Sequence, residues 1–247
     1  AQTMPPTSAP TPPGFGARVR RLIHRPSGNA LRAAVLGVND GLVSSFCLVM
    51  GLEGAAATRE AVILAGLAGL VAGACSMALG EWLSVTNSRE MNNKRMRDMA
   101  NEIEHDAGKA RQRLVTVITG KGLPPADAER AADEIMRNPR TALDTFARDV
   151  LGINPQERGG NPVQAAVISF VLYSSGALVP LLPFLVTAGP SARLGSIIAC
   201  LAGLGLVGWG TSSFNGRAGW FSAVRQIVIG GMAAAFTYGL GTVFGSL

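Results

Sequence analysis

Long apolar blocks, separated by short polar links, limit this chain to one kind of architecture. They occupy residues 31–52, 61–85, 163–186, 194–214 and 222–244, approximately. Each block reaches the roughly 20 residues that an α-helix needs to cross a hydrocarbon layer of ~30 Å. We therefore expect an all-α membrane protein with five transmembrane helices, the third of which is interrupted by Pro180 and Pro183 within PLLPF.

The charged residues collect between the second and third blocks. The stretch from Trp82 to Asn161 holds 13 of the 22 Lys/Arg and 12 of the 16 acidic residues. Helical patterns at about 87–119, 125–137 and 139–151, separated by GKGLPP and NP, predict a three-helix domain inserted between the second and third spans. The expected organisation is a disordered tail and basic membrane-proximal segment at 1–30, transmembrane helices one and two at 31–86, a cytoplasmic helical domain at 87–161, and transmembrane helices three to five at 162–247.

The distribution of basic residues predicts the orientation. Five spans place the N-terminus, the inserted domain and the link before the last span on one side of the membrane. That side carries five arginines of the N-terminal segment, the 13 Lys/Arg of the domain, Arg217 and Arg225, whereas the other side carries only Arg59 and Arg193. The positive-inside rule then places the N-terminus and the domain in the cytoplasm and the C-terminus outside. The expected location is the plasma (inner) membrane.

Several other classes of protein are not favoured by the sequence. The net charge of +6 does not indicate nucleic-acid binding, because no cluster combines Arg/Lys with interleaved aromatic residues. Cys47, Cys75 and Cys200 lie inside apolar blocks without CxxC spacing, which favours small buried side chains over disulfides or thiolate metal ligands. No nucleophile–base pair or cofactor loop is evident, so we expect neither an enzyme nor a permanently bound cofactor.

Asp40 is the only acidic residue that lies well inside an expected span. It follows Leu31 by nine residues, about 13 Å along a helix axis. A carboxylate at that depth costs a few kcal/mol, and such residues usually face an aqueous pathway and bind an ion or a proton. The structural alternative is a hydrogen bond to Asn39 or Ser44, or an ion pair with an arginine, although we expect no arginine at that depth.

Met77 and Glu81 continue a ridge of small residues in the second span, formed by Ala65, Gly69 and Gly73. Similar ridges recur in the fourth and fifth spans (Gly195, Ala199, Gly203; Gly231, Ala235, Gly239). Such ridges let helix backbones approach closely in lipid. A thioether beside a carboxylate suits Fe²⁺, Mn²⁺ or Co²⁺ better than Mg²⁺ or Ca²⁺. Packing for Met77, and simple contact with interfacial water for Glu81, are the alternatives.

Four segments resemble the vacuolar iron transporter family: LRAAVLGVNDGLVSSFCLVMGL, GLVAGACSMALGEWLSVTNSRE, GALVPLLPF and TYGLG. The resemblance extends over nearly all of the chain from Leu31 onward. It implies a homodimer of five-span protomers in membrane lipid that exports Fe²⁺ or Mn²⁺ from the cytosol in exchange for protons. It also implies a pathway between the protomers lined by Asp40 and Met77, with Glu81 matching the family's GE pair.

The expected cytoplasmic domain departs from what the resemblance implies, which is a dense set of glutamates and methionines that collect metal. Glu102 and Glu104 stand at the start of the expected acidic run. They are followed by Lys109, Arg111 and Arg113, and Phe146 and Ala147 occupy positions where methionines are common. The sequence thus indicates an atypical domain that would serve dimerisation, and it leaves open whether the domain loads metal. We also expect a bacterial-type member of the family. The alternative function is a membrane-anchored interaction or regulatory protein that uses this helical bundle without transport.

Overall fold

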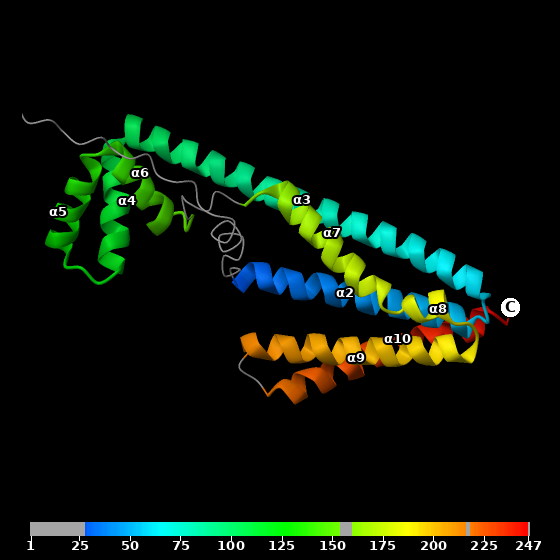
Figure 1. Cartoon of the computed structure of the whole chain (residues 1–247). Helices are drawn as coiled ribbons and strands as arrows, with labels where there is room; N and C mark the ends of the chain where they lie inside the picture. The colour runs from blue at the N-terminus through cyan, green and yellow to red at the C-terminus, as the bar shows by residue number, and fades with distance from the viewer. Residues whose placement is uncertain (1–27, 154–159, 216–217, 247) are drawn as a thin grey trace, which may run out of the picture.

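The computed structural model describes residues 28–153, 160–215 and 218–246. Within these ranges the chain is helical, without strands (Figure 1). The helices are α2 (Gly28–Gly54), α3 (Arg59–His105), α4 (Ala107–Gly120), α5 (Pro125–Met136), α6 (Pro139–Asp149), α7 (Pro162–Leu178), α8 (Leu182–Val186), α9 (Pro190–Asn215) and α10 (Gly219–Phe244). Helices α2, α7, α9, α10 and the first half of α3 form a bundle, and α4–α6 gather at the far end of α3. The tail expected at 1–30 falls almost wholly outside the described residues.

Four helices are long and apolar enough to cross a membrane: α2 from Ala34, α3, α9 up to Ser212, and α10. This confirms an all-α membrane protein. The expected third span is interrupted, as its two prolines predict: α7 ends at Leu178 and only the short α8 follows. Pro180 and Pro183 lack the N–H groups that would continue the helical hydrogen bonds, which explains the break.

Side chains from two other helices satisfy backbone carbonyls in this break and at the end of α8. The buried Ser196 hydroxyl of α9 donates to the Pro180 carbonyl at 2.8 Å. The Arg59 guanidinium, at the start of α3, donates to the carbonyls of Phe184, Leu185 and Thr187 at 2.7–3.1 Å. An unsatisfied carbonyl in hydrocarbon costs several kcal/mol, so these bonds let a broken helix persist at membrane depth.

Helix α3 differs from the two separate helices expected in the second span and at the start of the inserted domain. It runs unbroken for 47 residues, roughly 70 Å, from the membrane bundle into the α4–α6 domain. The sequence from Trp82 to His105 contains neither Gly nor Pro, so nothing ends the helix where the composition changes. The helix expected at 87–119 is instead interrupted at Asp106, whose carboxylate caps α4 by accepting from the Lys109 N–H. Helices α5 and α6 confirm the expectations for 125–137 and 139–151.

Glycines bring α2 and α7 to backbone contact. A Cβ added to Gly41 of α2 would lie 2.1 Å from the Tyr173 carbonyl oxygen, and one added to Gly176 of α7 would lie 2.1 Å from that of Val38. Gly54 of α2 and Gly241 of α10 make the same reciprocal contact. Because lipid gives helices no hydrophobic reason to associate, such close approach supplies much of the packing energy.

Only some of the expected small-residue ridges are used for packing. On α3, Gly69 lies against Leu48 and Gly73 against the Tyr173 ring, as a contact ridge requires. On α10, a Cβ at Gly239 would meet nothing within 4 Å. The largest apolar side chains of the bundle core come instead from α2, α8, α9 and the α7–α8 break (Leu42, Phe46, Val49, Leu181, Phe184, Leu204).

These contacts predict that Gly41→Ala destabilises the bundle. The added methyl overlaps the α7 backbone, which cannot move as a flexible side chain would, so we expect a loss of about 1–3 kcal/mol and a Tm lower by several degrees. Thermal unfolding in detergent, followed by tryptophan fluorescence, measures the change. Gly239→Ala is the matched control and should leave Tm unchanged; equal melting of both variants would contradict the packing described.

Candidate functional site

Asp40 lies on the open side of the bundle rather than inside it. Its side chain is exposed in the single chain and belongs to a stripe on α2 with Leu36, which is 57% exposed, and Ser44. Within the described residues, the Asp40 carboxylate takes part in no hydrogen bond or ion pair. Its depth along α2 agrees with the sequence analysis, but the chain itself does not bury it.

Tyr173 of α7 is the central side chain of this region, and sequence analysis did not single it out. It is 6% exposed, its ring lies against Gly73, and its hydroxyl is 2.8 Å from the Ser44 hydroxyl. Ser44 donates its own proton to the Asp40 backbone carbonyl at 2.6 Å, so Tyr173 is the donor to Ser44. Ser44 therefore does not bind the Asp40 carboxylate. The one available signal was a tyrosine inside an apolar block, where its hydroxyl needs a partner.

Asn39 points to a different helix. Its side-chain oxygen accepts a hydrogen bond from the Gln226 amide of α10, another residue that sequence analysis missed. The pair brings Arg225 close to the level of Asp40, so the expectation that no arginine lies at that depth is wrong. Arg225 is exposed and forms no ion pair with Asp40 within 4 Å. An arginine partner for Asp40 is thus not found among the described side chains.

Met77 and Glu81 face α2 and α7, one helical turn apart on α3. Met77 is half-buried beside Tyr173 and Ala74, and its methyl carbon lies 3.8 Å from the point where a Cβ on Gly37 would sit. Glu81 is half-buried and lines a cavity of about 200 Å³ at the end of the bundle nearer the α4–α6 domain. Glu81, Met77 and Asp40 therefore occupy successive levels of the α2–α3 pair, spread over about 10 Å.

The interior of the α4–α6 domain is apolar, and an ion pair occupies the place of one of the expected metal ligands. Phe146 and Ala147 are fully buried in the core that also includes Met99 and Leu114. Glu102 is paired with Arg113 at 2.7 Å, and its other carboxylate oxygen is buried without a partner. Glu104 is exposed. The described residues form no group of three or more His, Cys, Asp or Glu side chains with metal-binding geometry.

Helix α4 is joined to each of its three neighbours by an ion pair. Arg113 pairs with Glu102 of α3, Arg111 with Asp133 of α5, and Lys121, at the end of α4, with Asp149 of α6. Hydrogen bonding to Arg111 lowers the pKa of Asp133 below its ordinary value. The contribution of that pair to stability is therefore complete at neutral pH and is lost as the pH falls through the lowered pKa.

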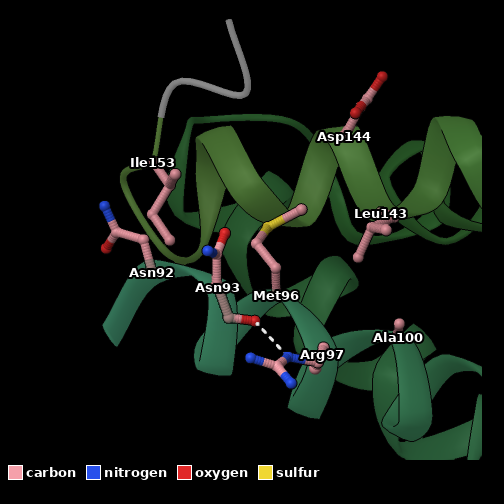
Figure 2. Close-up of a pocket in the computed structure, with 8 residues that line it drawn as sticks. All are labelled: Asn92, Asn93, Met96, Arg97, Ala100, Leu143, Asp144 and Ile153. Atoms are coloured by element: carbon pink, nitrogen blue, oxygen red, sulfur yellow. Dashed lines mark hydrogen bonds between the residues drawn. The ribbon is translucent and has the colours of Figure 1, made fainter. Parts of the chain in front are cut away.

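Figure 2 shows a second cavity, of about 480 Å³, between α3 and α6. Met96 and Asn93 lie along it, and the Arg97 Nε–H donates to the Asn93 carbonyl at 3.4 Å. The Asp144 carboxylate points away from these side chains. This cavity therefore lacks convergent metal ligands.

Comparison with known proteins places this arrangement in a family. The chain matches the VIT family over residues 31–242. It is 33% identical to "Vacuolar iron transporter 1" of Oryza sativa subsp. japonica over 88% of this chain and 86% of that protein. It is 36% identical to "Vacuolar iron transporter homolog 1" of the same organism (87% and 74%) and 28% identical to "Vacuolar iron transporter 1" of Arabidopsis thaliana (89% and 88%). The chain belongs to the VIT family.

Membership of the VIT family confirms the resemblance seen in the NDGL and SMALGEWLSV segments, both of which lie inside the matched range. The names of the relatives also point to a transport protein rather than an enzyme. In this VIT family chain, apolar contacts and ion pairs among the described residues hold the α4–α6 domain together.

We predict that Arg113→Ala destabilises the α4–α6 domain. It would leave the mostly buried Glu102 carboxylate without its partner, at a cost of about 1–3 kcal/mol. Hydrogen–deuterium exchange of the full chain should show faster exchange in α4 and in the end of α3. Arg137→Ala is the control, because its pair with Glu134 is exposed and should contribute little. Adding EDTA to the parent should leave exchange unchanged; a large effect of EDTA would contradict a domain held by ion pairs.

Proposed function

We propose that this chain moves divalent transition metal, Fe²⁺ or Mn²⁺, out of the cytosol across a membrane in exchange for protons, as a homodimer. The observation that carries the proposal is the position of Asp40, a carboxylate at membrane depth on an open face of the bundle. Family membership and the relatives' names support a metal cargo.

The exposure of Asp40 supports a second protomer. A carboxylate that faced lipid tails at this depth would cost several kcal/mol. None of the described side chains of the same chain compensates that cost. A second copy packed against the stripe of Leu36, Asp40 and Ser44 would shield the carboxylate from lipid and bring a second Asp40 across a shared pathway.

The side chains of Glu81, Met77 and Asp40 support a metal ion as the cargo. Glu81 and Asp40 offer oxygen ligands, and Met77 between them offers sulfur. Borderline ions such as Fe²⁺ and Mn²⁺ accept both kinds of ligand, whereas Mg²⁺ gains little from a thioether. A carboxylate removed from water needs a cation or a proton, so alternate occupancy of Asp40 by metal and proton provides the exchange. Asn39 and Ser44 would act by holding the backbone around Asp40 rather than as ligands.

In the proposed orientation the α4–α6 domain faces the cytosol. The C-terminal end of α10 lies at the opposite end of the bundle from that domain, in keeping with a C-terminus on the other side (Figure 1). The relatives are named for the vacuole, so their names lend no support to the expected plasma membrane. Family membership favours transport over the alternative of a membrane-anchored regulatory protein.

Reconstitution in liposomes tests this proposal. Asp40→Asn removes the charge with little change in shape, and we expect the initial rate of Fe²⁺ or Mn²⁺ transport to fall at least about tenfold and the coupled proton flux to disappear. Glu60→Gln, an exposed carboxylate at the start of α3, is the matched control and should transport as the parent does. A parent rate in Asp40→Asn would refute the proposal, and metal flux without proton flux in the parent would refute the exchange.

A further inference from the structure

The cavity at Glu81 contains polar groups from α7 to which the proposed pathway assigns no role. It has a volume of about 200 Å³ and lies between α2, α3 and α7. Gln164 and Ser169 line it opposite Glu81, and Ala34 and Leu172 supply apolar wall. The α7 residues that line it fall on one helix face, since they follow the i, i+3, i+4 spacing of such a face.

The oxygen atoms available in this cavity can be identified. Asn161 also lines it, but its side-chain oxygen caps α7 by accepting from the N–H groups of Val163 and Gln164. The side chains of Glu81, Gln164 and Ser169 make no such bonds within the described part of the chain. One carboxylate, one amide oxygen and one hydroxyl therefore remain to receive a ligand.

Size and charge indicate which ligand suits the cavity. At about 30 Å³ for each water, 200 Å³ accommodates roughly six water molecules, comparable to a divalent cation with its first water shell. An anion would meet the Glu81 carboxylate, and the α7 N-terminus that might attract it is already capped by Asn161. The lining holds a single negative charge and no sulfur, so it favours weak binding of hard, hydrated cations.

We infer that Gln164 and Ser169, together with Glu81, provide the oxygen ligands of a mostly apolar loading chamber that receives a divalent cation with most of its water shell, before the ion reaches Met77 and Asp40. This inference rests on the proposed function and extends it to α7. Because the chamber offers only oxygen ligands, it binds Mg²⁺ and Mn²⁺ alike, and discrimination between them begins one helical turn further on, at Met77.

Transport kinetics of the full chain in liposomes test the chamber. For the double variant Gln164→Leu/Ser169→Ala, we expect the half-saturating Mn²⁺ concentration to rise roughly tenfold, as for the loss of two neutral ligands, with the maximal rate unchanged. Inhibition by Mg²⁺ should weaken by the same factor. Gln164→Glu, which adds a carboxylate, should lower the half-saturating concentration. Ser175→Ala is the control on α7, because that hydroxyl bonds only to its own helix at Leu172.

The outcomes separate this inference from the proposed function. If Asp40→Asn abolishes transport while the double variant keeps the parent's half-saturation, the chamber is refuted and the proposed function stands. Mn²⁺ binding, followed by electron paramagnetic resonance, provides a test independent of transport. In an Asp40→Asn background the chamber should still bind Mn²⁺, and adding Gln164→Leu/Ser169→Ala should remove that binding. Equal binding in the two proteins would refute the chamber even if the parent does not transport.

Discussion

Helix α7 lies against α2 at backbone-contact distance and against α3 through the Tyr173 ring, and these contacts position the polar groups of the membrane bundle. Gly41 and Gly176 have no side chains and so let the backbones of α2 and α7 approach closely, and Gly73 of α3 leaves room for the Tyr173 ring. These contacts place the N-terminal half of α7 beside Glu81 and place Tyr173 beside Ser44. In lipid, where apolar surface gains nothing by association, a contact of this kind has to come from glycine rather than from larger apolar residues.

The absence of water in the hydrocarbon layer explains how the remaining polar groups are arranged. Ser196 binds a carbonyl in the α7–α8 break, Arg59 binds carbonyls at the end of α8, and the Asn39 amide is bound to Gln226. Each of these groups has a partner on another helix, which also fixes the helices to one another. Asp40 is different, because its carboxylate is the strongest acceptor in this region and the described chain gives it no donor. A group that is costly and left without a partner is where an external cation or proton gains most free energy.

The sequence predicted those parts of the fold that depend on local pattern. Apolar length identified α2, α9 and α10, and prolines at the first turn marked the starts of α5 and α6. The expected boundary near Val85 is wrong, because the composition of the chain changes there but no Gly or Pro ends α3. Depth along a helix could be counted for Asp40, but the direction it faces is set by the packing of α2. The pairs Ser44–Tyr173 and Asn39–Gln226 join residues 129 and 187 positions apart, so no local pattern could reveal them.

The α4–α6 domain bears on how metal would reach the membrane in the proposed transport. Arg111, Arg113 and Lys121 each pair with an acid on a neighbouring helix, so these three carboxylates stabilise the domain instead of attracting cations. A cluster of uncompensated carboxylates raises the local concentration of divalent ions, and pairing three of the domain's carboxylates with basic side chains weakens that effect. Glu81 is the carboxylate that lines the end of the membrane bundle nearer this domain. Metal capture in this chain would therefore depend on the bundle itself. The ion would first bind weakly to oxygen ligands beside Glu81, close to the Met77 sulfur and the Asp40 carboxylate.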